Sequence, residues 1–195
     1  MVLAAHSQGQ STPPNNGGSP WTGGVHLLTE IQKAPVALIP YPRKVVWESG
    51  GPFQLPAKCS ISCESESLNA ALSRMLAEAG IAVERASENQ TANVQIRIDP
   101  QQISHSEAYH LAVGKAGVIA TGHDAAGAFY AIQTLRQMLR KDDRGTFIPL
   151  ARIEDSPAFP IRGFMHDTGR NFQSIESLKR QLDHFAAYKL NTFHW

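Results

Sequence analysis

The chain has 195 residues, of which 42% are hydrophobic and 18% charged, and its formal net charge is +1. This length allows one ordinary domain, or one domain with a long tail and a piece of something else. The composition argues against disorder throughout, and the near-neutral charge argues against a nucleic-acid partner. No apolar run approaches the roughly 20 residues that a membrane-spanning helix requires, so no membrane span is expected.

Residues 1–34 are predicted to form a flexible leader. The stretch "QGQSTPPNNGGSPWTGG" (8–24) is rich in Ser, Pro, Asn and Gly, and it cannot bury enough apolar surface to offset its ordering entropy. Before it, "VLAA" (2–5) could end a signal-peptide core ahead of a cleavage site, although the basic start and most of the apolar core are missing. The leader is therefore interpreted as a possible signal-peptide remnant, and a periplasmic or secreted location is expected.

The two cysteines, Cys59 and Cys63, lie in "KCSISC". In an extended strand four residues span roughly 13 Å, which exceeds the Cα separation of a disulfide. A two-cysteine zinc site would need further ligands, and no histidine pair stands at a suitable short spacing. We expect no metal and no cofactor.

Residues 35–150 alternate between strand and helix patterns. The segment 36–55 is broken by prolines and glycines and suits edge strands, and "AKCSISC" (57–63) is the next strand candidate. A helix is predicted over 65–80, because a serine opens it and Gly80 stands where a C-terminal cap belongs. Its apolar stripe consists of Leu68, Leu72, Met75, Leu76 and Ala79.

The same domain continues with a strand at 92–99 and a hairpin at 108–122, whose turn is "GKAG". A second helix is predicted over 125–140, with Asp124 as its cap. This order indicates an α+β domain, with a mainly antiparallel sheet and two helices on one face. Because the segment offers no nucleophile with a base, no phosphate loop and no carboxylate pair, a structural or accessory role is favoured.

The last segment, 151–195, has a different pattern. A connector, "ARIEDSPAFP" (151–160), leads into a strand over 161–169 and then a helix that begins near Ser174. The helix carries Ile175, Leu178, Leu182, Phe185 and Ala186 on one face. A further strand starts in "LNTFHW" (190–195). Strand, helix and strand within about 35 residues form one βαβ unit, whose two strands must be parallel.

At this point the residues resemble a known family. "RGFMHDTGRNF" and "YKLNTFHW" are similar to the opening of the catalytic barrel in family 20 glycoside hydrolases, the β-N-acetylhexosaminidases. The family pattern is approximately R-G-x-x-x-D-x-x-R-H-[FY], then a helix and Y-K-[LMF]-N-x-[FL]-H-[WL]-H-L-x-D. The matching residues are Arg162, Gly163, Asp167, Arg170, Phe172, Tyr188, Lys189, Leu190, Asn191, Phe193, His194 and Trp195. Segments 38–55 and 108–139 resemble the α+β accessory domain that precedes this barrel.

The resemblance implies that 151–195 is the first βαβ unit of a truncated (β/α)8 barrel. It also implies hydrolysis of terminal non-reducing N-acetylhexosamine residues from oligosaccharides or glycoconjugates, by substrate-assisted retaining catalysis. The family's catalytic Asp–Glu pair follows the fourth barrel strand, so no catalytic residue lies within this chain and the fragment alone is expected to be inactive. The alternative is a non-catalytic carbohydrate-binding or interaction module, in which 162–195 folds back to complete one unit.

Two substrate-binding residues are implied. Arg170 follows the carboxyl end of the first strand, where barrel active sites are built, and its guanidinium could donate to two vicinal sugar hydroxyls. The alternative for Arg170 is a surface arginine paired with an acid. Asp167 alternates with Met165 and should point inward, where it could hold Arg170 or contact the sugar.

Other residues of this motif are assigned structural roles. Arg162, at the opposite end of the strand, is expected to form a structural ion pair. His166 and Asn171 depart from the family pattern, which has an apolar residue and a histidine there, and His166 is expected to pack against the covering helix. His194 and Trp195 are expected to support the barrel core.

Overall fold

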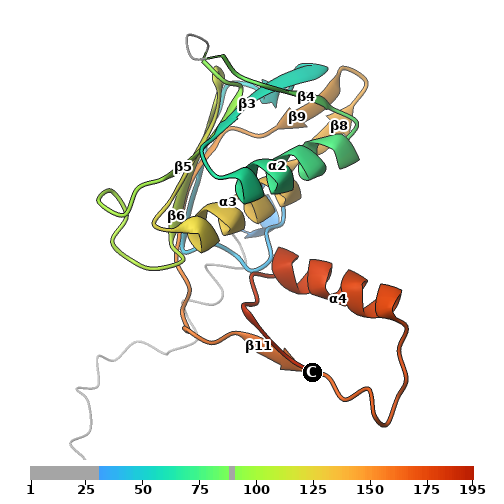
Figure 1. Ribbon diagram of the computed structural model, residues 1–195. Coiled ribbons are helices and arrows are strands. Elements are labelled where there is room, and N and C mark those ends of the chain that lie inside the picture. The colour runs from blue at the N-terminus through green and yellow to red at the C-terminus, as the bar shows by residue number, and fades with distance from the viewer. Residues whose placement is uncertain (1–30, 88–90) are drawn as a thin grey trace, which may run out of the picture. The chain divides into compact units, whose positions relative to one another are not determined.

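The computed structural model describes residues 31–87 and 91–195, so most of the predicted leader lies outside the described residues. Contacts divide the chain into 1–34 and 35–195, and the second part is described here (Figure 1). We call residues 35–155 the sheet domain and residues 162–195 the βαβ unit.

The sheet domain is built on a seven-stranded sheet in the order β1-β10-β6-β7-β5-β3-β4. The pairs β1/β10, β10/β6 and β6/β7 are antiparallel. The pairs β7/β5, β5/β3 and β3/β4 are parallel. The strands are β1 (Lys44–Trp47), β3 (Lys58–Cys63), β4 (Ala82–Arg85), β5 (Val94–Ile98), β6 (Tyr109–Gly114), β7 (Gly117–Gly122) and β10 (Ala151–Asp155).

The expectation of a mainly antiparallel sheet was therefore wrong, because half of the neighbouring pairs are parallel. Helix α2 (Glu66–Glu78) connects β3 to β4, and a helical crossover returns the chain in the same direction. The strand β4 was not predicted, and it is the strand that this crossover requires. The β6/β7 hairpin with its turn after Gly114 is confirmed.

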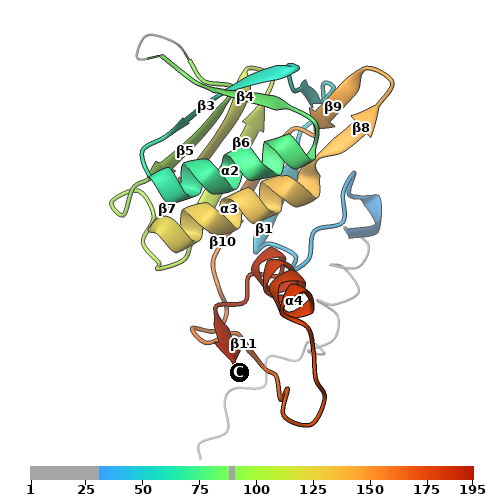
Figure 2. The ribbon, with the colours of Figure 1, turned by 45° about the vertical axis from the view of Figure 1, so that its right-hand side comes forward.

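Helices α2 and α3 (Ala125–Met138) lie side by side on one face of this sheet, as predicted (Figure 2). In α2 the buried residues are Leu68, Leu72, Met75 and Leu76. Helix α3 ends at Met138 instead of Arg140, because Arg140 already begins strand β8. The three short strands β2 (Phe53–Gln54), β8 (Arg140–Asp142) and β9 (Gly145–Ile148) form a second, antiparallel sheet in the order β2-β9-β8.

The predicted connector 151–160 needs a correction. Its first half is strand β10, which lies between β1 and β6 in the large sheet. Ala151 and Ile153 are fully or almost fully buried, while Arg152 and Glu154 are exposed, which is the alternation of a half-buried strand. The boundary between the two segments therefore follows Asp155, not residue 150.

Both cysteines lie in β3 and are free thiols, as the extended spacing predicts. Cys59 is fully buried in the core, and its burial raises the pKa of its thiol to about 11. A thiol that stays protonated and is shielded from solvent is a poor nucleophile, so Cys59 has a packing role.

Asp124 caps α3 and ties it to the preceding loop. Its Oδ1 accepts from the Gly127 N–H at 2.8 Å, and its Oδ2 accepts from the Glu107 N–H at 3.0 Å and from Ser106 Oγ at 2.8 Å. Burial by itself raises the pKa of this carboxyl, but the three hydrogen bonds outweigh burial and hold the pKa below its ordinary value. The ionised carboxylate therefore stabilises the fold.

Replacing Asp124 by alanine is expected to lower the free energy of unfolding by about 1 to 2 kcal/mol at neutral pH. Because the folded-state pKa is lower than the unfolded one, this contribution is complete above the ordinary carboxyl pKa and is lost as the pH falls through the lowered value. Urea unfolding at about pH 7 and about pH 3 measures it. An equal loss at both pH values would contradict the expectation.

The βαβ unit is confirmed. Strand β11 (Gly163–Met165) and strand β12 (Thr192–His194) pair in parallel, with Phe164 opposite Phe193, and α4 (Ile175–Ala187) connects them. The ring of Phe185 on α4 lies 5.1 Å from that of Phe164 and 5.8 Å from that of Phe193. These aromatic contacts attach the helix to one face of the two-stranded sheet. This small sheet is separate from the large one, and β11 lies away from the large sheet (Figure 1).

Candidate functional site

A hollow lies at the carboxyl ends of β11 and β12. Its volume is about 460 Å³, and it is lined by Met165, His166, Asp167, Thr168, Gly169, His194 and Trp195. The Trp195 indole N–H donates to Thr168 Oγ1 at 2.9 Å, which joins the loop after β11 to the end of β12. The two strand ends thus form one site because parallel strands end at the same edge of a sheet.

Asp167 and Arg170 lie together in the loop after β11. Asp167 Oδ1 accepts from the Gly169 N–H at 2.9 Å, and Asp167 Oδ2 lies 3.5 Å from Arg170 Nε. The Arg170 side chain is 89% exposed, so this ion pair positions the guanidinium but adds little stability. Within residues 31–87 and 91–195 neither Nη group of Arg170 has a protein partner. The expected contact between the two residues is present, and the guanidinium fork is accessible to a ligand.

His166 lies on the helix side of the β11–β12 sheet, as expected. Its ring is 5.9 Å from the ring of Phe164 and 6.5 Å from the ring of Phe193, both of which contact α4 through Phe185. Its backbone N–H donates to the carbonyl of His194 at 2.9 Å and extends the parallel ladder. By contrast, His194 and Trp195 are exposed in this chain and line the hollow, so no packing role of theirs is visible here.

Arg162 lies at the amino end of β11, opposite to Arg170 along the strand. Its Nη2 is 2.6 Å from Glu107 Oε2 and donates to the Tyr130 hydroxyl at 3.2 Å. Its Nε and Nη1 donate to the carbonyls of Lys189 and Phe159, both at 2.8 Å. The expected structural ion pair is confirmed, and it joins the βαβ unit to the sheet domain.

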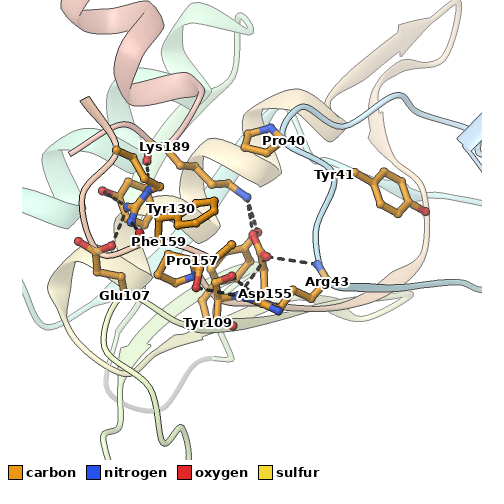
Figure 3. Close-up of a pocket in the computed structure, with 13 residues that line it drawn as sticks. Pro40, Tyr41, Arg43, Glu107, Tyr109, Tyr130, Asp155, Pro157, Phe159 and Lys189 are labelled. Carbon is orange, nitrogen blue, oxygen red and sulfur yellow. Dashed lines mark hydrogen bonds and ion pairs between the residues drawn. The ribbon is translucent and has the colours of Figure 1, made fainter. Parts of the chain in front are cut away.

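A second buried ion pair was missed by sequence reasoning. Lys189 Nζ lies 2.8 Å from Asp155 Oδ2 and donates to the Tyr109 hydroxyl at 2.8 Å (Figure 3). Burial lowers the pKa of Lys189, although the Asp155 carboxylate opposes this shift. The pKa of Tyr109 is raised, mainly by burial and to a lesser extent by the Asp155 carboxylate. The Tyr109 hydroxyl also contacts Thr134 Oγ1 at 2.6 Å. We call these four residues the Lys189 cluster.

No local sequence pattern predicts the Lys189 cluster. Asp155 and Lys189 are separated by 34 residues along the chain, and sequence periodicity reports only on neighbours within one element. Three members of the cluster, Tyr109, Asp155 and Lys189, line a cavity of about 320 Å³ between the end of β10 and the start of β11. Within the described ranges, no group of three His, Cys, Asp or Glu side chains has the arrangement of a metal site, and no helix is both long and apolar enough to cross a membrane.

Comparison with known families assigns both segments. Residues 36–156 match the model described as glycosyl hydrolase family 20, domain 2, and residues 159–195 match that of the family 20 catalytic domain. The chain belongs to glycoside hydrolase family 20. The boundary between the two family 20 matches follows β10, where the structure also separates the sheet domain from the βαβ unit.

Three family 20 relatives illustrate the similarity. A β-hexosaminidase of Porphyromonas gingivalis is 33% identical over 173 residues, which cover 82% of this chain and 22% of that protein. The structure of a Vibrio harveyi exo β-N-acetylglucosaminidase in complex with N-acetylglucosamine is 28% identical with a TM-score of 0.72, and the match covers 81% of this chain and 25% of that one. A Streptomyces plicatus N-acetyl-β-hexosaminidase is 29% identical with a TM-score of 0.69, over 80% of this chain and 33% of that one. The chain thus spans a third or less of these relatives.

Proposed function

We propose that this chain is the N-terminal part of a β-N-acetylhexosaminidase, which removes terminal non-reducing N-acetylhexosamine residues from oligosaccharides or glycoconjugates. The observation that supports this most is the coincidence of the catalytic-domain match over 159–195 with a parallel βαβ unit. The Asp167–Arg170 pair follows the carboxyl end of β11, and this is the end of a barrel strand that carries active sites. We take β11 and β12 as the first two strands of an eight-stranded barrel.

The proposed reaction is substrate-assisted. The acetamido oxygen of the sugar attacks the anomeric carbon, a glutamic acid protonates the leaving oxygen, and an aspartate orients the acetamido group. In the family this Asp–Glu pair follows the fourth strand and is not among these 195 residues. Arg170 would donate both Nη groups to adjacent sugar hydroxyls, while Asp167 holds the guanidinium through Nε.

The names of the relatives support an amino-sugar substrate for the proposed enzyme. The Vibrio harveyi structure contains N-acetylglucosamine, and a relative from Bombyx mori, 42% identical over 84 residues, is named a chitooligosaccharidolytic β-N-acetylglucosaminidase. A periplasmic or secreted location is part of the same proposal. Fractionation of the source cells with a chain-specific antibody tests the location.

A free-standing sugar-binding module would be the other function. It requires that 162–195 complete the sheet domain. Among residues 31–87 and 91–195, however, β11 and β12 pair only with each other and add no strand to the seven-stranded sheet. Calorimetric titration of the isolated chain with N-acetylglucosamine separates the two functions. We expect no binding heat and no turnover of an aryl N-acetylglucosaminide, whereas binding at millimolar or lower concentration would favour the module.

Replacing Arg170 by lysine tests the proposed site in the natural gene product that contains this chain. A lysine cannot reproduce the two-pronged hydrogen bond, so we expect kcat/KM for an aryl N-acetylglucosaminide to fall about 10- to 100-fold. The matched control is Arg152→Lys on β10, which removes another largely exposed arginine, here paired with Glu48, and should leave kcat/KM unchanged. Equal rates for Arg170→Lys and the unaltered enzyme would exclude Arg170 from the sugar site.

A further inference from the structure

The βαβ unit contacts the sheet domain through the amino ends of its strands. Arg162 directly precedes β11 and Asn191 directly precedes β12. Asn191 Oδ1 accepts from the Arg162 N–H at 2.9 Å, and Asn191 Nδ2 donates to Glu107 Oε1 at 3.1 Å and to the Pro160 carbonyl at 2.8 Å. Glu107, in the loop before β6, thus contacts the residue that precedes each of the two strands, Arg162 and Asn191.

Lys189 reaches deeper into the sheet domain than these residues. It follows the end of α4 with a positive φ of 61°, and its N–H donates to the Ala186 carbonyl at 3.0 Å. A non-glycine residue in the left-handed region is uncommon and needs a compensating contact. Here the side chain is only 8% exposed, and its ammonium lies between Asp155 Oδ2 and the Tyr109 hydroxyl.

The acceptor for this ammonium is held independently of Lys189. Asp155 Oδ1 accepts from the Arg43 N–H at 3.2 Å and from the Ser156 N–H at 3.0 Å. Tyr109 is fixed in turn by Thr134 of α3. The sheet domain therefore presents a preformed acceptor built from β6, α3 and β10, and the chain after α4 provides the cation that fits it.

We propose that Lys189 is a positioning residue, whose ammonium fixes the amino ends of β11 and β12 on the sheet domain and thereby sets where their carboxyl ends lie. Directional hydrogen bonds permit one position, whereas apolar contacts alone would allow sliding. A buried ion pair is weak evidence for stability, because desolvation offsets attraction, and the lowered pKa of Lys189 agrees with such an offset. Its role is to select one geometry.

This attachment leaves the opposite strand ends accessible. Arg162 and Lys189 hold the amino ends, while Asp167 and Arg170 lie beyond the carboxyl end of β11. The sheet domain consequently supports the βαβ unit without covering the loop that follows β11. Lys189 has this positioning role whatever the chemistry of the sugar site.

Hydrogen exchange on the 195-residue chain tests the proposal. Lys189→Met keeps most of the apolar stem of the side chain and removes the ammonium, so peptides covering 162–166 and 189–194 should exchange about tenfold faster or more. Peptides of β5 and β7 should keep their rates. The control is Lys44→Met, which removes the exposed pair with Glu154, the neighbour of Asp155 on β10, and should change neither region.

A double variant separates the effect of breaking the ion pair from the effect of losing side-chain packing. The substitution Lys189→Met leaves the Asp155 carboxylate without its ammonium partner, and adding Asp155→Asn removes that charge. The double variant should therefore exchange more slowly in 162–166 and 189–194 than the sum of the single effects predicts. Should Lys189→Met fail to fold, Tyr109→Phe deletes only one hydroxyl and should accelerate the same two segments. Unchanged exchange there, or equal acceleration of β5 and β7, would overturn the proposal.

Discussion

Replacing Leu135 by alanine is expected to lower the free energy of unfolding of the sheet domain by about 2 to 5 kcal/mol. Leu135 is fully buried on α3 and belongs to the core between the helices and the sheet. Alanine removes apolar contacts and leaves a cavity that the packed layers fill only in part. Urea unfolding followed by circular dichroism measures the change, which should appear as a lower midpoint with an unchanged slope.

The matched control is Leu182→Ala on α4. Leu182 is also a leucine within a helix of similar length, but 43% of it is exposed in this chain. Alanine has a slightly better helix propensity than leucine, so the loss should stay below about 1 kcal/mol. Equal losses for the two variants would show that the core does not lie where α3 meets the sheet.

Replacing Gly127 by alanine is expected to destabilise the sheet domain by about 3 kcal/mol. A Cβ added to Gly127 would lie 2.2 Å from the Ala108 carbonyl oxygen, which is backbone and cannot rotate away. Helix α3 would have to move away from β6, and this movement would strain the Asp124 cap, which binds the Gly127 N–H. The melting temperature and the urea midpoint should both fall.

Gly114→Ala provides the comparison for Gly127→Ala. A Cβ at Gly114 would have its nearest neighbour, the Gly117 carbonyl oxygen, at an ordinary 4.0 Å, so the free energy of unfolding should change by less than about 0.5 kcal/mol. If both glycine variants unfold alike, the close approach of α3 to the loop before β6 is not a constraint on the fold.

Local hydrophobic patterns in the sequence identified the elements that bury one face and expose the other. The stripe of α2, the hairpin around Gly114 and the βαβ unit are each visible as a period in the sequence. Strand β10 was not predicted, although Ala151 and Ile153 alternate with polar neighbours. The strand is short, and the segment that continues it contains Pro157 and Pro160, which are typical of a connection. The parallel pairing of β3 with β4 and β5 could not be predicted from the sequence either, since strand order depends on contacts between distant segments.

The candidate site was predictable only in part. Motif spacing led to Arg170 and Asp167, and their contact follows from three residues of separation on one loop. The Lys189 cluster could not be predicted from motif spacing. Tyr109, Asp155 and Lys189 come from three separate elements, and each has an ordinary structural interpretation when taken alone.

The sequence by itself determined the βαβ unit and the loop that carries Arg170, because strand period, helix stripe and motif spacing are properties of consecutive residues. Only the tertiary structure decided how that unit attaches to the sheet domain. A lysine and an aspartate 34 residues apart become partners only after β10 has entered the sheet and α4 has returned the chain to it. A buried charge needs a specific partner, and which partner it finds is determined by the folded chain as a whole.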